Sequence, residues 1–562
     1  TRIADGVTLT LGNRNIDSNF ISLGDGSTLL IGSGSIVGAI TSDINASSAT
    51  ASFANTRTLT SDTIINPTGP LNISILDGVT LTANNDISGS VLTVGGGTSG
   101  ALILGSSQTL TGALTLANNA TATLNANSTI TGTTSLGSSS TLNINSGVST
   151  GAINGTAANQ GTVNYLSSYN ITSSNAVGAT NAVSAITVAG GATLDVDTSI
   201  AANTLTVGAG TSGALDLASS TTLTGNLVLG DNATATLNSS STVSGTVGLS
   251  TGSTLNLKNG ASTGAISTDT NNQGSVTIDG TVVAGGNYGA SNLTLNSITI
   301  GASDTLDAAT NNAAIFSTGV TIGSSGVLAL GTGSVEGGIQ GASNGVGTLN
   351  INDNHTLLRE IGEGNALEVI NVAANKTLNA NFQDINAALG INLNSGSILT
   401  LATGRVTGGV QGVSTGNGTV NLNGDSTLAG SLGSAVRLGT VAVGSSATVN
   451  TGANVINTEL LTVADGAALT VANDITVTAN ATIGDGTSGI LSINSGKTLT
   501  GDVVLNSGAQ LNLTGSVTGS ITGLLDASIS LTKSGSMGAC GGLPNSVMSA
   551  PAINTLPMPT IT

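Results

Sequence analysis

The chain repeats itself, and this repetition limits its possible folds more than any other feature. Nearly the same sixteen residues occur three times, as GTSGALILGSSQTLTG (97–112), GTSGALDLASSTTLTG (210–225) and GTSGILSINSGKTLTG (486–501). The first two copies belong to a longer repeat, because residues 93–164 align with residues 206–277 without a gap. A further pair joins residues 333–352 to residues 404–423. Such self-similarity is typical of architectures in which each structural unit packs on its neighbours.

A shorter period lies inside the first long copy. The motifs TLTG, TITG and VSTG end at Gly112, Gly132 and Gly151, which are 20 and 19 residues apart. Apolar residues recur at the same spacing in three columns, which are Leu104, Leu124 and Ile144, then Leu110 and Ile130, then Leu116 and Leu136. Three apolar columns per coil predict a triangular cross-section, with a short strand on each face and a Gly, Asn or Ser turn at each corner. The spacing predicts an all-β fold, a parallel β-helix (β-solenoid) with triangular coils of about 19–20 residues.

The composition fits a narrow aliphatic core. Only 1% of the residues are aromatic, 38% are hydrophobic, and the mean hydropathy is +0.32. A disordered chain would combine low hydropathy with high net charge. Apolar residues occur in short bursts and never in a run of ~18, so we expect no membrane-spanning helix. We predict one solenoid domain over residues 1–533, a rod of roughly 25–28 coils about 4.8 Å apart, and a non-repetitive tail over residues 534–562.

Charge and cysteine content exclude several functions. The formal net charge is −18, and the ten Lys and Arg residues are scattered along the chain. Nucleic acids and anionic membrane surfaces require a clustered basic patch, so we expect neither as a partner and no membrane insertion of this chain. The single cysteine, Cys540, excludes an intrachain disulfide and a multi-cysteine metal site. The chain begins at Thr1 without Met or an apolar signal segment, so we expect a processed product or a fragment.

The tail differs in composition from the rest of the chain. All three Met and four of the six Pro residues lie between Met537 and Pro559. Because proline removes a ladder donor, we expect this segment not to continue the stack of coils. One interpretation is an extended linker, and the alternative is an apolar segment that docks on another copy by strand addition. In that alternative the self-assembly residues are Leu543, Val547, Met548, Ile553, Leu556 and Met558.

Two segments raise the question of a catalytic or metal site. Residues 352–370 hold the only histidine, His355, close to Asp353. One histidine without a nearby cysteine gives too few ligands for a tight zinc site, so we expect a solvated loop or exposed face. Asp195 and Asp197 match only part of the Gly-rich nonapeptide pattern of calcium-binding β-helices. We therefore predict no catalytic, cofactor-binding or metal-binding residues.

Three classes of function are compatible with such a solenoid, and they differ in the residues that each one needs. A β-helical enzyme acting on polysaccharides would need two placed carboxylates and aromatic platforms for sugars. The aromatic residues are scattered, apart from the pair Tyr165 and Tyr169. An ice-binding surface would need a flat threonine array, and outward pairs such as Thr109 and Thr111 are interrupted after two coils. The sequence favours the third class, a structural or adhesive protein without enzymatic activity.

Two Gly-rich segments carry a resemblance to a known family. GGVQGVSTGNGTVNLNGDSTLAGSLG (408–433) and GGIQGASNGVGTLNINDNHTLL (337–358) resemble repeats of autotransporter passenger domains, especially rickettsial-type outer-membrane surface antigens. The resemblance implies a right-handed parallel β-helix on the extracellular surface of a bacterial cell, serving as an adhesin or a coat component. Its partners would be other copies of itself, end to end or lateral, and the surface of a host or neighbouring cell.

A second interpretation of the whole chain stays open. The solenoid would then be a self-assembling subunit of an extracellular filament or surface layer, joined head to tail through residues 534–562. The first residues, TRIADGVTLTLG (1–12), already have the pattern of a coil. Open solenoid ends expose unpaired strand edges and normally carry caps, and in a filament the neighbouring copy would provide the cap.

Overall fold

The computed structural model describes the chain except for residues 61–62, 66, 525, 532–535, 538–547 and 550–562. The described residues form short strands, from β1 (Arg2–Ile3) to β62 (Met548–Ser549), and contain no helix. Accordingly, the described part of the chain has no helix that could cross a membrane. Neighbouring strands pair in parallel, one coil apart. The predicted all-β parallel β-helix is confirmed.

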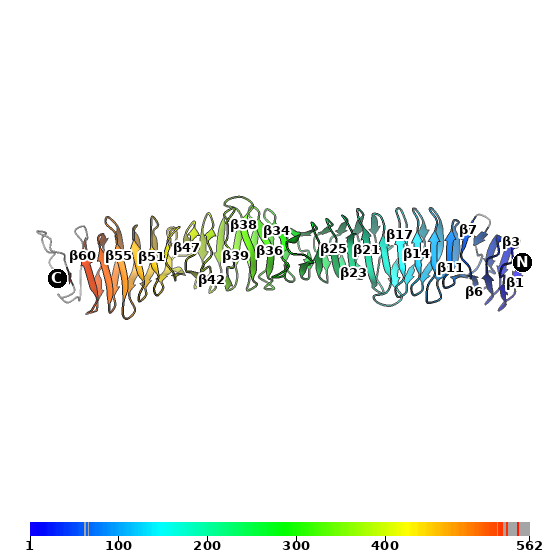
Figure 1. The fold of residues 1–562 in the computed structure, drawn as a ribbon, viewed down its shortest axis with the longest axis horizontal. Helices are drawn as coiled ribbons and strands as arrows, with labels where there is room; N and C mark the ends of the chain where they lie inside the picture. The colour runs from blue at the N-terminus through cyan, green and yellow to red at the C-terminus, as the bar shows by residue number, and fades with distance from the viewer. Residues whose placement is uncertain (61–62, 66, 525, 532–535, 538–547, 550–562) are drawn as a thin grey trace. The chain divides into compact units, whose positions relative to one another are not determined.

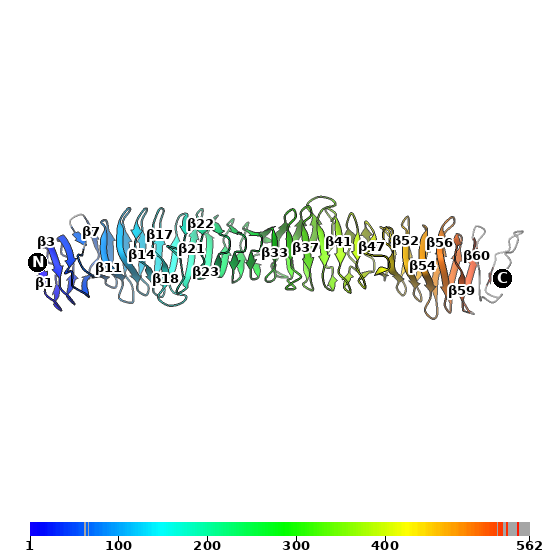
Figure 2. The ribbon, with the colours of Figure 1, turned by 180° about the vertical axis from the view of Figure 1, so that it is seen from behind.

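The chain divides into two compact units, Thr1–Val276 and Thr277–Thr562. Within each unit the strands of successive coils lie side by side (Figure 1), and the view from behind shows the same stacking on the other side (Figure 2). The first unit contains two 13-stranded sheets. The second unit contains a 7-stranded sheet from β33 (Thr281–Val283) to β47 (Val410–Gly412) and an 11-stranded sheet that begins at β40 (His355–Thr356).

One face of the coil is a ladder of four-residue strands. In the first unit, β12 (Ala101–Leu104), β14 (Thr121–Leu124) and β17 (Thr141–Ile144) pair in parallel and in register. Leu104 lies beside Leu124, which confirms the first predicted apolar column. Burial alternates along each strand, so the aliphatic residues fill the core and the threonines face outward.

The two other faces come from one longer strand that turns a corner. β13 (Thr109–Leu116) passes through Gly112, whose φ is +123°. Its first half pairs with β15 (Thr129–Ile130) and its second half with β16 (Thr134–Leu136). Three strand faces in one coil confirm the triangular cross-section. A Cβ on Gly112 would overlap the carbonyl oxygen of Gly89 in the preceding coil, so this corner requires glycine.

The remaining corners use residues that tolerate a left-handed backbone. Ser107, Asn119 and Asn127 have φ values of 59°, 58° and 59°. The short polar side chains of Asn and Ser can hydrogen-bond locally in this conformation, whereas β-branched residues are strained there. The frequency of Asn and Ser in the sequence follows from the number of corners.

Two short strands of the tail continue the stack. β61 (Ser536–Met537) pairs with β58 (Ser516–Val517), and β62 pairs with β60 (Ser528–Leu531). No proline lies in either dipeptide, so both keep the N–H groups that a strand ladder needs. Of the predicted self-assembly residues, Met548 lies in β62. The others lie outside the described residues, and they are Leu543, Val547, Ile553, Leu556 and Met558.

Candidate functional site

In the repeated GTSG motif, a carboxylate on one coil holds the corner loop of the next. The Oδ1 atom of Asp77 accepts hydrogen bonds from the backbone N–H groups of Gly96, Thr98 and Ser99, at 2.7, 3.1 and 3.2 Å. These N–H groups stabilise the ionised carboxylate and lower the pKa of Asp77 to about 2, and the N–H of Ser99 makes the largest contribution. The first copy of the motif is therefore a capped turn, and these three N–H groups are engaged within the chain.

The second unit repeats this cap at Asp465. The carboxylate accepts hydrogen bonds from the backbone N–H groups of Asp485, Thr487 and Ser488, at 2.9, 3.0 and 3.0 Å. These hydrogen bonds lower the pKa of Asp465, and the N–H of Ser488 makes the largest contribution. The hydrogen bond and the negative charge of Asp465 in turn raise the pKa of Asp485. Two copies of the motif thus share one structural role.

The remaining copy of the motif has no carboxylate at this corner. The offset of 113 residues between the long copies places Gly190 at the position of Asp77. A Cβ on Gly190 would overlap the hydroxyl of Thr211, which is the threonine of that GTSG loop. The threonine hydroxyl lies in the space that an aspartate side chain would need, so this copy forms its corner without a cap.

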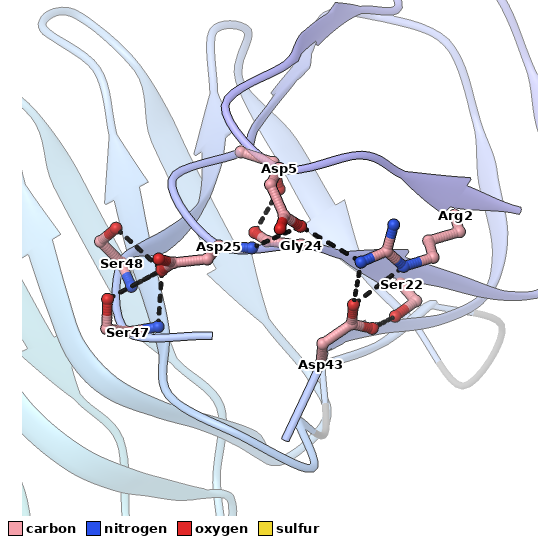
Figure 3. A network of polar contacts seen from close by, with 9 residues as sticks. Arg2, Asp5, Ser22, Gly24, Asp25, Asp43, Ser47 and Ser48 are labelled. Carbon is pink, nitrogen blue, oxygen red and sulfur yellow. Dashed lines mark hydrogen bonds and ion pairs between the residues drawn. The ribbon is translucent and has the colours of Figure 1, made fainter. Parts of the chain in front are cut away.

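The first coils carry a network of charged and hydroxyl side chains (Figure 3). The Nη2 atom of Arg2 lies 3.1 Å from Oδ1 of Asp5 and 2.6 Å from Oδ2 of Asp43. Ser22 donates a hydrogen bond to Asp43, and this bond, followed by that of Arg2, lowers the pKa of the Asp43 carboxyl. Because the Arg2 side chain is 55% exposed, solvent screens these ion pairs and they add little stability. The Arg2–Asp43 pair joins the first coil to the third, past Ser22 on the coil between them.

Asp25 caps the neighbouring corner of the same network (Figure 3). Its Oδ1 atom accepts hydrogen bonds from the N–H and the hydroxyl of Ser47, at 2.7 and 2.8 Å, and from the N–H of Ser48 at 3.1 Å. The N–H of Ser47 makes the largest contribution to lowering the pKa of Asp25. The sequence interpretation missed these caps. Their signal is an Asp-Gly pair one coil before a Ser-Ser or Thr-Ser pair.

The outward amides of the second unit form a ladder. Asn371 donates to Asn350 at 3.0 Å, Asn392 donates to Asn371 at 2.9 Å, and Gln411 donates to Asn392 at 2.9 Å. These side chains occupy one register position on four successive coils. Stacked amides of this kind stabilise parallel in-register strands, so the ladder belongs to the scaffold.

The expectation of a solvated loop at His355 is wrong. The side chain of His355 is 5% exposed, and its Nδ1 lies 3.0 Å from the carbonyl oxygen of Gly331. Its Nε2 has no hydrogen-bond partner among the described residues, and burial lowers the pKa of the imidazole. Asp353 forms an ion pair with Lys376 at 2.9 Å instead of contacting His355. The two residues therefore do not form a catalytic pair, and the histidine occupies a core position.

The carboxylates at Asp195 and Asp197 lie near a third one that the sequence interpretation overlooked. Asp195 pairs in register with Asp216 on the next coil, and Asn170 donates a hydrogen bond to Asp197 at 3.0 Å. The pKa of Asp195 is raised mainly by desolvation, and the negative charges of Asp216 and Asp197 raise it further. Among the described residues, no three His, Cys, Asp or Glu side chains are placed to hold a metal ion.

The tyrosine pair is buried and is unavailable as a sugar platform. The ring centroids of Tyr165 and Tyr169 are 4.8 Å apart with an interplanar angle of 32°. Tyr165 is 0% exposed and Tyr169 is 9% exposed. The Tyr169 hydroxyl forms a hydrogen bond with Thr150 at 3.2 Å, so this pair packs the interior of the first unit.

One face of the second unit is interrupted. β46 (Val406–Thr407) pairs with β43 (Ile385–Asn386) in a two-stranded sheet, whereas β49 (Ser426–Thr427) begins a separate seven-stranded sheet. No pairing joins β46 to β49 among the strands that the structure describes. A hollow of about 340 Å³ lies here, lined by Thr403 and Arg405 on one coil and by residues 425–429 on the next. We call it the Arg405 hollow.

Comparison with family models, with curated proteins and with solved structures found no match to this chain.

Proposed function

We propose that this chain is a non-enzymatic structural protein of the extracellular bacterial surface, an adhesin or a coat component. The observation that carries the proposal is that polar side chains on successive coils bind one another. Asp77 and Asp465 cap the corner loops of the next coil, and Asn371 belongs to an amide ladder. Catalytic groups must reach a substrate, whereas these groups hold the solenoid together.

The outward faces support a role in contact between surfaces. In the first unit, Thr121, Thr141 and Thr162 occupy one column on successive coils. Thr123 and Asn143 belong to the adjacent column of the same face. These side chains are half-buried by their neighbours, which leaves a regular surface of hydroxyl and amide groups. Such a surface supports binding through many weak contacts made at once.

Two measurements test this proposal. Protease added to intact cells that produce the protein should degrade it, while a cytoplasmic control protein stays whole. Beads coated with the folded chain should attach to cells more strongly than beads coated with the same chain after unfolding. A protein that is protected until the cells are lysed would contradict the surface location, and equal attachment of both bead types would contradict the adhesin role.

A filament subunit is the second candidate, and the observation that favours it is the pairing of β62. Met548 lies in register beside Ile529 of β60, so tail backbone can add to the end of a sheet as a strand. Electron microscopy of the purified chain should then show long filaments, and deletion of residues 534–562 should shorten them to single particles. Single particles in both preparations would contradict this candidate.

A further inference from the structure

The Arg405 hollow contains a cation without a partner. The guanidinium of Arg405 makes no hydrogen bond or ion pair with any described residue, in a chain whose net charge is −18. Its backbone N–H donates to Asp384 at 2.8 Å, which fixes the main chain at this point. Arg437, in the same unit, pairs with Glu459 at 3.3 Å. A guanidinium presents a planar set of donors that suits a carboxylate, and Arg405 is one of the residues that line the hollow.

Two apolar residues, Leu428 and Ala429, line the hollow. Leu428 is 9% exposed, whereas Leu401 and Val406, which line a smaller cavity of about 20 Å³ beside the hollow, are each 5% exposed. Stacked core leucines such as Leu104 are 0% exposed. Where β46 and β49 do not pair, the edge of Leu428 is therefore open to the hollow. Ligand sites commonly combine an apolar contact with a few convergent polar groups in a hollow.

The rim across from Arg405 supplies hydrogen-bonding groups. One carboxylate oxygen of Asp425 accepts the N–H of Thr448 at 2.7 Å, and the other has no partner among the described residues. The hydroxyls of Ser426 and Thr427 also make no hydrogen bond to described residues. The hollow thus combines one cation, one carboxylate acceptor and two hydroxyls beside the apolar side chain of Leu428.

We propose that the Arg405 hollow binds a carboxylate-bearing sugar residue, namely a uronic acid or a sialic acid of a surface glycan. Arg405 binds the sugar carboxylate, Asp425 accepts hydrogen bonds from ring hydroxyls, and the C–H face of the ring packs on Leu428. A sulfate or phosphate has negative oxygens on every side, so Asp425 repels it. The inference rests on the proposed adhesin function, since it names the ligand for one part of that contact surface.

Titration of the full chain with free sugars tests the inference. Glucuronate and N-acetylneuraminate represent the two sources of the carboxylate, and glucose and inorganic sulfate lack one of the required features. We expect binding of at least one of the two acidic sugars and none of glucose or sulfate, measured by calorimetry or saturation-transfer NMR. Arg405→Gln should weaken binding about 10- to 100-fold, as expected for loss of a charge-assisted hydrogen bond.

Arg359→Gln is the matched control, because Arg359 is an exposed arginine of the same unit that does not line the hollow. It should bind the acidic sugar as tightly as the unchanged chain. Asp425→Asn should also weaken acidic-sugar binding, and circular dichroism should show all three variants folded. Equal affinity for sulfate, or unchanged sugar binding in Arg405→Gln, would overturn the inference.

The inference and the adhesin proposal fail in different ways. If Arg405→Gln abolishes sugar binding but beads coated with this variant still attach to cells, the hollow is a sugar site that is separate from adhesion. If no acidic sugar binds while bead attachment persists, the sugar inference is wrong and the adhesin proposal stands. If an acidic sugar binds but no attachment occurs, the sugar site stands without the adhesin role.

Discussion

Asp77 shows how a single carboxylate couples one coil to the next. Its pKa in the folded chain is about 2, whereas an unperturbed aspartate titrates near pH ~3.9. The folded state therefore binds fewer protons between these values, and the carboxylate contributes stability above about pH 4 that is lost as the pH falls through about 2. For Asp77→Asn we expect a lower thermal unfolding midpoint at neutral pH and a flatter pH dependence in this window.

Asp231→Asn is the control for this prediction. Asp231 is an exposed corner aspartate whose side chain makes no hydrogen bond to a described residue. Its substitution should leave both the midpoint and the pH profile of the first unit close to those of the unchanged chain. Identical behaviour of the two variants would mean that the N–H cluster around Asp77 does not stabilise the coil.

His355 gives the opposite pH effect to a capping aspartate. Burial lowers the pKa of its imidazole in the folded chain, and the unfolded chain titrates near pH ~6.5. As the pH falls below ~6.5, the unfolded chain takes up a proton that the folded coil excludes, so stability decreases toward the folded pKa. We expect His355→Leu, which keeps an apolar core, to reduce the loss of stability between neutral pH and pH 5 in urea unfolding. Equal pH slopes would assign this acid sensitivity to other groups.

At the scale of elements, glycine occupies the position at which a strand bends from one face of the coil to the next. Gly112 and Gly97 both have positive φ, at 123° and 138°. A Cβ on Gly97 would meet no atom within 4 Å, whereas a Cβ on Gly112 would overlap the carbonyl oxygen of Gly89. Gly97→Ala should therefore cost only the backbone strain, about 1–3 kcal/mol, and Gly112→Ala should cost more. Urea unfolding of the two variants measures the difference, and equal losses of stability would contradict the overlap.

The strand columns are predictable from sequence because stacking restricts them. A slip of one residue would move every inward leucine of a strand to the outside, so the column through Leu104 and Leu124 must keep its spacing. The positions of Thr109 and Thr111 are confirmed for the same reason, since they flank the buried Leu110 and face outward.

The His355 core position and the Arg405 hollow could not be predicted in this way. The burial of His355 depends on a carbonyl oxygen of the preceding coil, at Gly331, and no local pattern places that atom. The hollow arises because β46 and β49 on adjacent coils do not pair, which is a property of two distant segments. The Asp-Gly pair of each cap is visible in the sequence. The loop that it binds lies one coil away, so a local pattern does not connect the two.

At the scale of the whole molecule, each unit is a stack in which a coil packs on its two neighbours. The stability of such a stack is approximately a sum of coil and nearest-neighbour terms. A defect in one coil should therefore spread only a short distance along the chain. In a globular domain with one cooperative core, the same defect would lower protection throughout.

Leu124→Ala tests this expectation in the first unit. Leu124 is 0% exposed and lies between Leu104 and Ile144, so its truncation should cost about 2–5 kcal/mol. Hydrogen exchange followed by mass spectrometry should show faster exchange in β12, β14 and β17, and unchanged exchange in the coils of the second unit. Thr123→Ala, an outward position on the same strand, should change exchange little because such substitutions stay within about 0.5 kcal/mol. Uniformly faster exchange in both units would show that the coils unfold as one cooperative body, and the nearest-neighbour description would then be wrong.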